Sequence, residues 1–360
     1  MPLRIYCSVC GKNYEPRIRP VRCACGQPLS CVMDWEKLRI NRAASGMWRY
    51  GSVLPLVPAG LSMGEGWTPL LSSKGESGLL YKLEFMAPTG SFKDRGAVMV
   101  VADALACDCD SVVIDSSGNA GASVAAYAAR AGIKATVIVP EGTSEGKKHQ
   151  IASFGAEVLA RGRKRSKTAA FAWGMARDVF YASHVWNPLF LEGTKTVAFE
   201  IWEQLGHKAP DVVISPAGNG TLLLGLFKGF RELSQRALID RIPRIVAAQA
   251  EKCAPLKNAS FGRKASCGGT CAEGIAVSNP PRLEEMLKAV RSSRGDIVTV
   301  SEKEIIEAKE CLAKDEGLYV EPTAAVAPAA GKALRASGFF KADETVVIPL
   351  TGSGLKSPGH

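Results

Sequence analysis

Residues 111–139 read SVVIDSSGNAGASVAAYAARAGIKATVIV, and the order of apolar runs and glycines in them indicates the fold class. It opens with a short apolar run, Ser111–Asp115, that is typical of a buried strand. A glycine-rich loop follows, and then an alanine-rich helix is predicted over Ala120–Ala131. A second apolar run at Ala135–Val139 predicts the next strand. Strand, helix and strand in this order indicate a βαβ unit with parallel strands.

The same alternation continues along the chain. Residues Ile151–Leu159 pass from helix through glycine to strand, and a helix is predicted over Glu302–Lys314. Further strands are predicted at Val212–Ser215, Arg244–Ala250 and Thr345–Leu350. Because 360 residues exceed the usual size of a single core, we expect two parallel α/β lobes and an appendage.

Composition and charge favour a soluble protein and bear on which partners it binds. With 46% hydrophobic and 22% charged residues, no membrane-length apolar run and no secretory signal, the chain is expected to be soluble and cytoplasmic, without a membrane partner. The net charge of +10 suits nucleic acid or anionic small molecules. The densest basic run, RGRKRSK at 161–167, carries no aromatic residue, so we expect no nucleic-acid partner.

The N-terminal segment, residues 1–35, carries two pairs of cysteines. Cys7 and Cys10 form a CxxC pair, Cys23 and Cys25 form a CxC pair, and a glycine follows each pair. Four thiolates in two such turns suit a tetrahedral Zn²⁺ or iron ion, which would supply the folding energy of a ribbon of about 30 residues. The alternative is four unpaired thiols in a loose tail. The remaining cysteines lack paired ligand spacing: Cys31, Cys107, Cys109, Cys253, Cys267, Cys271 and Cys311.

Three loops rich in glycine and hydroxyl groups follow predicted strands, at the ends where open α/β sheets bind ligands. The loop Ser116–Gly121 leads into a helix whose N-terminal amides could bind a carboxylate. The alternative is that the loop is a routine helix cap. The loop Pro216–Gly225 suits a phosphate, and Leu226 excludes a Walker loop because lysine is required there. The loop Leu350–Ser357 places Thr351 where a hydroxyl could meet a heterocycle nitrogen.

A lysine stands inside APTGSFKDRGAVM, residues 87–99. Ser91 is predicted to cap a helix, and Asp94 suits its first turn. On local sequence alone, Lys93 would be a solvated lysine at a helix start. An imine-forming lysine, a phosphate loop and polar ring partners are together what pyridoxal phosphate requires.

Six motifs in order then resemble the threonine synthases of the fold type II pyridoxal phosphate enzymes. They cover residues 60–356 and read GEGWTPL at 64–70, PTGSFKDRG at 88–96, SSGNAG at 116–121, LEGTKT at 191–196, the glycine loop at 218–221 and TGSGLK at 351–356. The resemblance implies a tryptophan synthase β-like fold and a homodimer. It divides the chain into a zinc-ribbon-like segment (1–35), a large cofactor-binding lobe (36–85 and 185–360) and a small α/β lobe (86–184).

The resemblance also implies roles for individual residues. Lys93 would hold the cofactor as an imine and shuttle protons, with Asn119 beside the cofactor's phenolic oxygen and Thr351 at its pyridine nitrogen. The cofactor phosphate would be held by Gly218, Asn219, Gly220 and Thr221. The substrate carboxylate would be held by Ser116, Ser117, Gly118 and Ala120. The metal ligands would be Cys7, Cys10, Cys23 and Cys25.

The reaction implied is the conversion of O-phosphohomoserine and water into threonine and phosphate, so the substrate is a small anionic amino acid. Phe190 departs from the family pattern, which often has arginine directly before LEG, and CAEGIAV at 271–277 looks closer to the hydroxyamino acid dehydratases. The alternative is therefore β-elimination or β-replacement on threonine, serine or phosphoserine, as in a dehydratase or a cysteate synthase. A zinc-ribbon nucleic-acid-binding protein is a further alternative, but it would leave the glycine loops without a role.

Overall fold

The computed structural model describes residues 3–17, 20–57, 60–163, 165–264 and 267–356. The chain forms two compact units. Unit 1 comprises Met1–Glu65 and Lys93–Thr194, and unit 2 comprises Gly66–Phe92 and Lys195–His360. The chain therefore passes from unit 2 into unit 1 directly before Lys93.

The main sheet of unit 1 has four parallel strands in the order β8-β7-β6-β9. The strands are β6 (Ser111–Asp115), β7 (Lys134–Val139), β8 (Glu157–Ala160) and β9 (Phe180–Tyr181). The parallel α/β architecture predicted from the sequence is confirmed, and the βαβ unit lies at its centre.

Helices cover both faces of this sheet because successive strand residues point to opposite sides. Val112 and Ile114 belong to one hydrophobic cluster together with α1 and α2, whereas Val113 belongs to a second cluster with Ala172 of α4. The helices of unit 1 are α1 (Lys93–Ala106), α2 (Asn119–Ala131), α3 (Glu145–Ala152), α4 (Arg165–Met175) and α5 (Phe190–Thr194).

The cysteine segment forms a three-stranded antiparallel sheet in unit 1. Its strands are β1 (Leu3–Cys7), β2 (Asn13–Tyr14) and β3 (Leu29–Met33), in the order β2-β1-β3, and a 3-10 helix follows at Gly46–Val53. Ile5 and Leu29 are fully buried in the same cluster as Val98 of α1 and Phe190 of α5. This ribbon therefore shares the core of unit 1.

Unit 2 is built on a six-stranded sheet in the order β12-β11-β10-β13-β5-β4. All neighbouring strands are parallel except the edge pair of β4 and β5. The strands are β4 (Leu70–Ser72), β5 (Leu79–Lys82), β10 (Val212–Pro216), β11 (Arg244–Ala250), β12 (Ile297–Val300) and β13 (Val346–Pro349).

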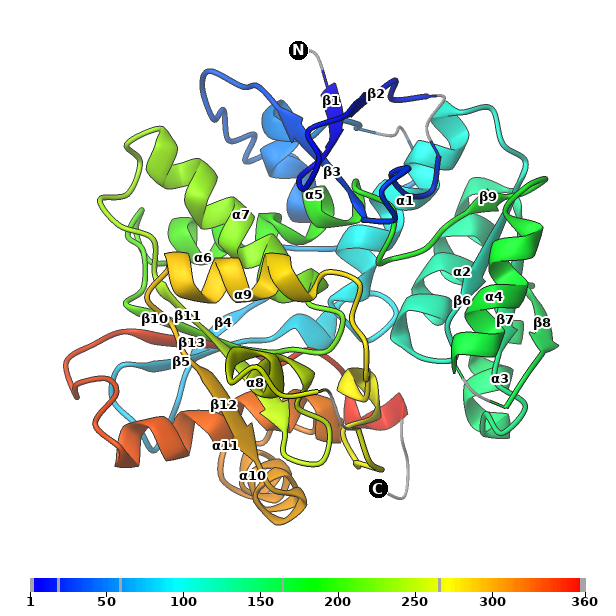
Figure 1. The fold of residues 1–360 in the computed structure, drawn as a ribbon. Coiled ribbons are helices and arrows are strands. Elements are labelled where there is room, and N and C mark those ends of the chain that lie inside the picture. The colour runs from blue at the N-terminus through cyan, green and yellow to red at the C-terminus, as the bar shows by residue number, and fades with distance from the viewer. Residues whose placement is uncertain (1–2, 18–19, 58–59, 164, 265–266, 357–360) are drawn as a thin grey trace. The chain divides into compact units, whose positions relative to one another are not determined.

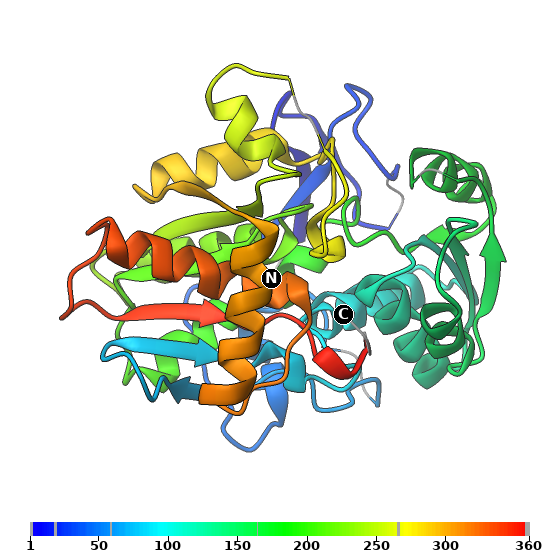
Figure 2. The same cartoon turned by 90° about the horizontal axis from the view of Figure 1, so that it is seen from below.

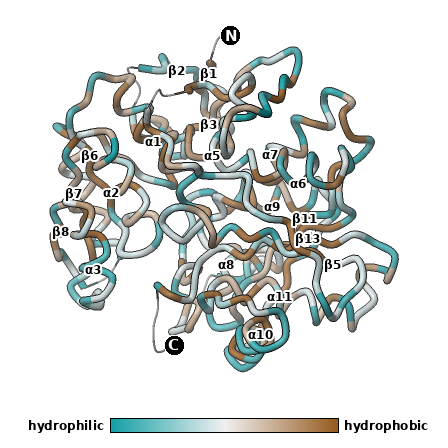
Figure 3. Tube along the Cα trace, turned by 180° about the vertical axis from the view of Figure 1, so that it is seen from behind, coloured by the Kyte–Doolittle hydropathy of each residue, from teal (hydrophilic) through white to brown (hydrophobic). Residues whose placement is uncertain are grey.

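Helices also cover both faces of this larger sheet. In Figure 1, α6 (Thr196–Gln204), α7 (Thr221–Gln235) and α9 (Leu283–Ser292) lie above it. Helices α10 (Glu302–Asp315) and α11 (Pro322–Ala336) lie below it and stand in front of the strands in Figure 2. Figure 3 shows the strands mainly in the hydrophobic colour and α10 largely in the hydrophilic one, as expected for an outer helix. The remaining short helices are η2 (Glu84–Met86), α8 (Pro255–Ser260), η3 (Glu273–Ile275) and η4 (Gly354–Lys356).

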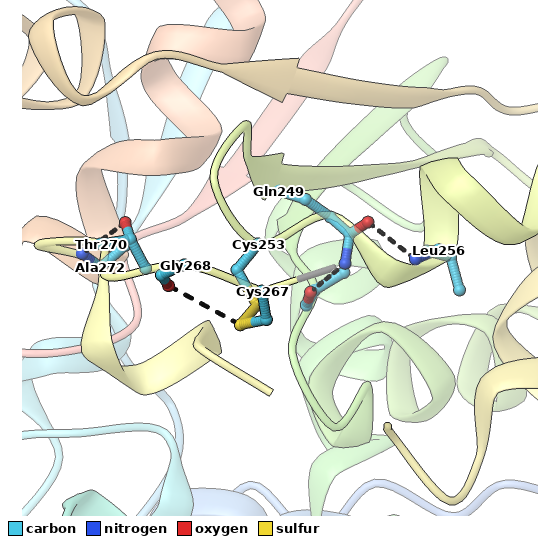
Figure 4. Close-up of a disulfide and its surroundings, with 8 residues drawn as sticks. Gln249, Cys253, Leu256, Cys267, Gly268, Thr270 and Ala272 are labelled. Atoms are coloured by element: carbon cyan, nitrogen blue, oxygen red, sulfur yellow. Dashed lines mark hydrogen bonds between the residues drawn. A yellow bond between two sulfur atoms is a disulfide. The ribbon is translucent and has the colours of Figure 1, made fainter. Parts of the chain in front are cut away.

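A disulfide joins Cys253 and Cys267, which the sequence did not single out as a pair. It closes the segment that carries α8, shown in Figure 4. Beside it, the buried side chain of Gln249 donates to the Ala217 carbonyl at 2.9 Å and accepts from the Leu256 amide at 3.0 Å. None of the helices in the described residues has the length and apolar character needed to span a bilayer.

Candidate active site

Lys93 is the first residue of α1, and its side chain is half-buried. Asp94 lies in the first turn, as predicted, and is fully buried. The predicted cap at Ser91 is wrong, because the Ser91 hydroxyl is buried and has no hydrogen-bond partner in the described part of the chain. Lys93 is therefore half-buried between buried residues and is not the fully solvated lysine of an ordinary helix start.

The segment before Lys93 pairs with the segment that follows β13. The Phe92 amide donates to the Thr351 carbonyl at 3.1 Å, and the Ser353 amide donates to the Gly90 carbonyl at 2.9 Å. Like Ser91, Thr351 is buried, and its Oγ1 has no hydrogen-bond partner among residues 3–17, 20–57, 60–163, 165–264 and 267–356. Two buried hydroxyls without partners are costly unless a bound polar group satisfies them.

These two hydroxyls fit a cofactor that presents a ring nitrogen or another polar atom at this place. Thr351 was predicted for that role, whereas Ser91 was not predicted as a site residue. The only signal for Ser91 in the sequence is a hydroxyl two positions before the lysine, and the same hydroxyl also suits a helix cap. Ser91 is identified as a candidate because its buried hydroxyl lacks a hydrogen-bond partner in the described residues, and only the tertiary structure shows this.

The glycine loop between β10 and α7 suits a phosphate. Gly220 has φ of +78° and supplies no side chain to cap α7, a helix of 15 residues. A Cβ on Gly218 would lie 2.8 Å from Ile275 Cα, and a Cβ on Gly220 would clash with Met286. The backbone is thus held in a shape that only glycine adopts easily, with a helix N-terminus available to an anion.

The four predicted phosphate ligands are consecutive in this loop. Gly218, Gly220 and Thr221 are buried, and Asn219 is half-buried. Thr351 lies near the same edge of the sheet, because β10 and β13 are parallel neighbours and both loops follow their carboxyl ends. Unit 2 therefore brings together the residues predicted for the cofactor's phosphate and pyridine nitrogen.

The loop predicted for the substrate carboxylate lies in unit 1, between β6 and α2. Gly118 precedes α2 and supplies no capping side chain, and no atom lies within 4 Å of a Cβ built on it. Its own amide donates to Ser116 Oγ at 3.4 Å. Ser117 and Asn119 are half-buried, and Ala120 is buried. Lys93 belongs to the same unit, and the helices that Lys93 and Asn119 begin pack against each other.

His184 contributes to the surroundings of Lys93, although no pattern in the sequence selects it. Burial, and then the positive charges of Lys93 and Arg165, lower the pKa of His184 well below its ordinary value. The imidazole is therefore neutral. Its ring meets the Phe190 ring edge-on, with the centroids 5.9 Å apart.

Two of the quoted motifs supply structural contacts. Glu65 of GEGWTPL is fully buried, accepts from Trp48 Nε1, and accepts from the Tyr127 hydroxyl at 2.7 Å. Lys195 of LEGTKT is also fully buried and forms an ion pair of 2.9 Å with Glu232. Both charges are thus engaged within their own units.

The four cysteines of the ribbon gather at one point. Their sulfur atoms all lie within 4.8 Å of one another, and Cys7–Cys25 and Cys10–Cys23 are 3.5 and 3.4 Å apart. Sulfur atoms of a tetrahedral zinc site with bonds of about 2.3 Å are about 3.8 Å apart, so the cluster fits this ion. The Tyr14 hydroxyl donates to Cys23 Sγ at 3.1 Å and lowers the pKa of this thiol to about 6, which favours the thiolate.

Comparison with known proteins decides the family. Residues 61–352 match the family model described as pyridoxal-phosphate dependent enzyme. The chain belongs to this family. Threonine synthase of Methanocaldococcus jannaschii is 35% identical over 98% of this chain and 92% of its own length. That of a Bacillus species is 38% identical over 86% of this chain and 89% of its own.

A solved structure supports the same assignment. The crystal structure of a T.th. threonine deaminase aligns with a TM-score of 0.67 and 29% identity, covering 79% of this chain and 92% of that one. The predicted fold type II architecture and the resemblance to threonine synthases are thereby confirmed. As a member of this family, the chain is a pyridoxal-phosphate-dependent lyase.

Proposed function

We propose that the protein converts O-phosphohomoserine and water into threonine and inorganic phosphate. The observation that carries this proposal is the similarity to a threonine synthase along 98% of the chain. It includes the cysteine segment, which lies outside the residues that the family model matches.

Lys93 is the residue that we assign to the covalent link with pyridoxal phosphate. Gly218, Asn219, Gly220 and Thr221 would hold its phosphate at the N-terminus of α7, and Asn119 would lie beside its phenolic oxygen. Support comes from the uncapped start of α7 and from the buried Thr351 hydroxyl, which needs a polar partner. The bound cofactor supplies an electron sink that stabilises negative charge on the substrate carbons.

The chain's own groups then move protons and bind charge. Lys93 Nζ would accept the proton from the substrate α-carbon, give that proton up again as a general acid, and only then accept one from the β-carbon. The substrate carboxylate would be held at the start of α2 by Ser116, Ser117, Gly118 and Ala120. Because Thr351 offers a neutral hydroxyl and no carboxylate, it would not stabilise a protonated ring, which favours elimination and replacement over transamination.

The cysteine cluster is proposed to hold one structural Zn²⁺. Support comes from the sulfur spacing and from the two glycine turns, in which Gly11 and Gly26 have φ of +75° and +86°. Protein purified without chelators should contain about one zinc per chain. Replacing Cys7 and Cys10 together should release it, and metal analysis that finds none in the unaltered protein would contradict the assignment.

A second candidate is β-elimination from threonine or serine, as named for the solved deaminase. The observation in its favour concerns three motif positions that could have offered a substrate phosphate a cation. Phe190 is fully buried and apolar, Lys195 is paired with Glu232, and Lys356 Nζ donates to the Thr89 carbonyl at 2.8 Å. A substrate with an uncharged hydroxyl needs no cation at these positions, whereas a phosphate dianion is bound best by one.

A product screen on the purified holoenzyme separates the candidates. O-Phosphohomoserine should yield threonine and inorganic phosphate in equal amounts. A keto acid released from threonine or serine, with no reaction of O-phosphohomoserine, would instead favour the second candidate. Coupling of O-phosphoserine to sulfite would identify a β-replacement enzyme.

A further inference from the structure

The start of α5 packs tightly against the start of α1. A Cβ on Gly96 would lie 2.5 Å from the Phe190 ring, and a Cβ on Gly193 would clash with the Arg95 carbonyl. Gly96 is three residues after Lys93, so both lie on the same face of α1. The Phe190 ring therefore covers the helix face that carries the lysine, and the two glycines allow this close approach.

The Phe190 ring also lies close to the lysine amine. Its centroid is 5.7 Å from Lys93 Nζ, within the range in which an aromatic face attracts an ammonium group. The neutral His184 ring packs against another side of Phe190. Because Phe190 is fully buried, its ring has little freedom to move, and it forms a firm apolar wall beside Nζ.

The ribbon contacts the chain on both sides of Phe190, at Pro188 before α5 and at Glu192 within α5. The Cys31 thiol, in β3, approaches the Glu192 carboxylate and the Pro188 carbonyl, each at 3.3 Å. Cys31 is 3% exposed and Glu192 is fully buried, so water does not compete for these contacts. Cys31 is paired in register with Ile5 of β1, the strand that ends at Cys7 of the cysteine cluster.

We propose that Phe190 is a positioning residue for Lys93 and that the ribbon strand β3 holds Phe190 in place through Cys31 and Glu192. This inference rests on the proposed role of Lys93 as the cofactor lysine. The ribbon would then contribute to the geometry of the active-site lysine in addition to stabilising unit 1.

The test compares full-length variants with two readouts other than turnover. The first is the visible circular dichroism of the holoenzyme, which reports the asymmetric surroundings of the bound cofactor. The second is the rate at which an acylating reagent labels Lys93 in the cofactor-free protein, followed by peptide mass spectrometry. The variants are Phe190→Met, which keeps an apolar side chain without the ring, and the pair Cys31→Ala and Cys31→Ser. Cys311→Ala, at an exposed cysteine of α10, is the control.

Phe190→Met should change the dichroism and raise Lys93 labelling about two- to fivefold, because loss of the ring face favours the neutral amine. Cys31→Ala should change both signals in the same direction by a smaller factor. Cys31→Ser should restore them, since a hydroxyl can donate to Glu192 as the thiol does. Cys311→Ala should match the unaltered protein.

Two results would overturn the inference alone. One is that Phe190→Met and Cys31→Ala lower only the unfolding temperature and leave both signals unchanged, which would indicate a purely structural role. The other is that Cys31→Ser behaves like Cys31→Ala, which would remove the ribbon contact. Borohydride reduction of the holoenzyme tests the proposed function separately: an adduct on another lysine would overturn both together.

Discussion

Two loops of this protein have similar sequences and very different surroundings. The loops before α2 and α7 both follow a parallel strand, and both helices are preceded by a glycine that supplies no capping side chain. Gly118 has extended backbone angles and open space around it, whereas Gly220 has φ of +78° and lies against Met286. We call the loop before α7 the covered loop and the loop before α2 the open loop. Neighbouring side chains shape the covered loop before any ligand binds, whereas the open loop leaves space for a ligand. This difference suits a retained cofactor phosphate at α7 and an exchanging substrate at α2.

Removal of the lysine should have the largest effect. Lys93→Ala should abolish the borohydride-trapped adduct and turnover, because no amine remains to form the covalent link or to move the proton. Since the covered loop is preformed, the variant should still bind pyridoxal phosphate noncovalently. Equilibrium dialysis measures this binding, and complete loss of it would contradict the idea of a preformed phosphate site.

The disulfide tests what supports the covered loop. Cys253→Ser should lower the free energy of unfolding by about 3 kcal/mol, because the bridge closes a segment with a sequence separation of 14. Gln249 joins this segment to Ala217, directly before Gly218, so the cofactor should also dissociate faster. Chemical denaturation and absorbance measure the two effects. If the unaltered protein is equally stable with and without a reductant, the disulfide does not stabilise this loop.

The two glycines can be compared directly. Gly220→Ala should cost about 1–3 kcal/mol and weaken cofactor retention, because a left-handed backbone and Met286 both oppose a Cβ. Gly118→Ala is the matched variant, and it should change unfolding by less than about 0.5 kcal/mol while raising the Michaelis constant for the substrate. Equal losses of stability at both positions would eliminate the distinction between the loops.

The smallest expected effect concerns a hydroxyl beside the covered loop. Thr351→Val should stabilise the cofactor-free protein by about 1 kcal/mol, because it removes a buried group without a hydrogen-bond partner in the described structure. The same change should shift the absorbance of the bound cofactor. Thermal unfolding with and without pyridoxal phosphate measures the effect on stability. A loss of stability in the cofactor-free variant would contradict the prediction and indicate that Thr351 has a structural partner.

Several strands and helices, and their order along the chain, could be predicted from consecutive residues. The apolar runs at 111–115 and 244–250 became β6 and β11 with the predicted bounds, because a buried strand is recorded in consecutive residues. The glycine loops were identified for the same reason, since their backbone requirements are local. The resemblance to threonine synthases rested on such short motifs, and the comparisons confirm it.

Contacts between residues far apart in the chain could not be predicted from the sequence. The Cys253–Cys267 bridge and the contact of Cys31 with Glu192 have no local signal, because the partners are 14 and 161 positions apart in the chain. The Ser91 hydroxyl has none either, because its burial without a hydrogen-bond partner in the described residues depends on distant segments. From the local sequence alone, Ser91 could equally be a helix cap, each cysteine a free thiol and Glu192 a surface residue. Burial and close packing choose among such readings, and both depend on the whole fold, which no short window of sequence contains.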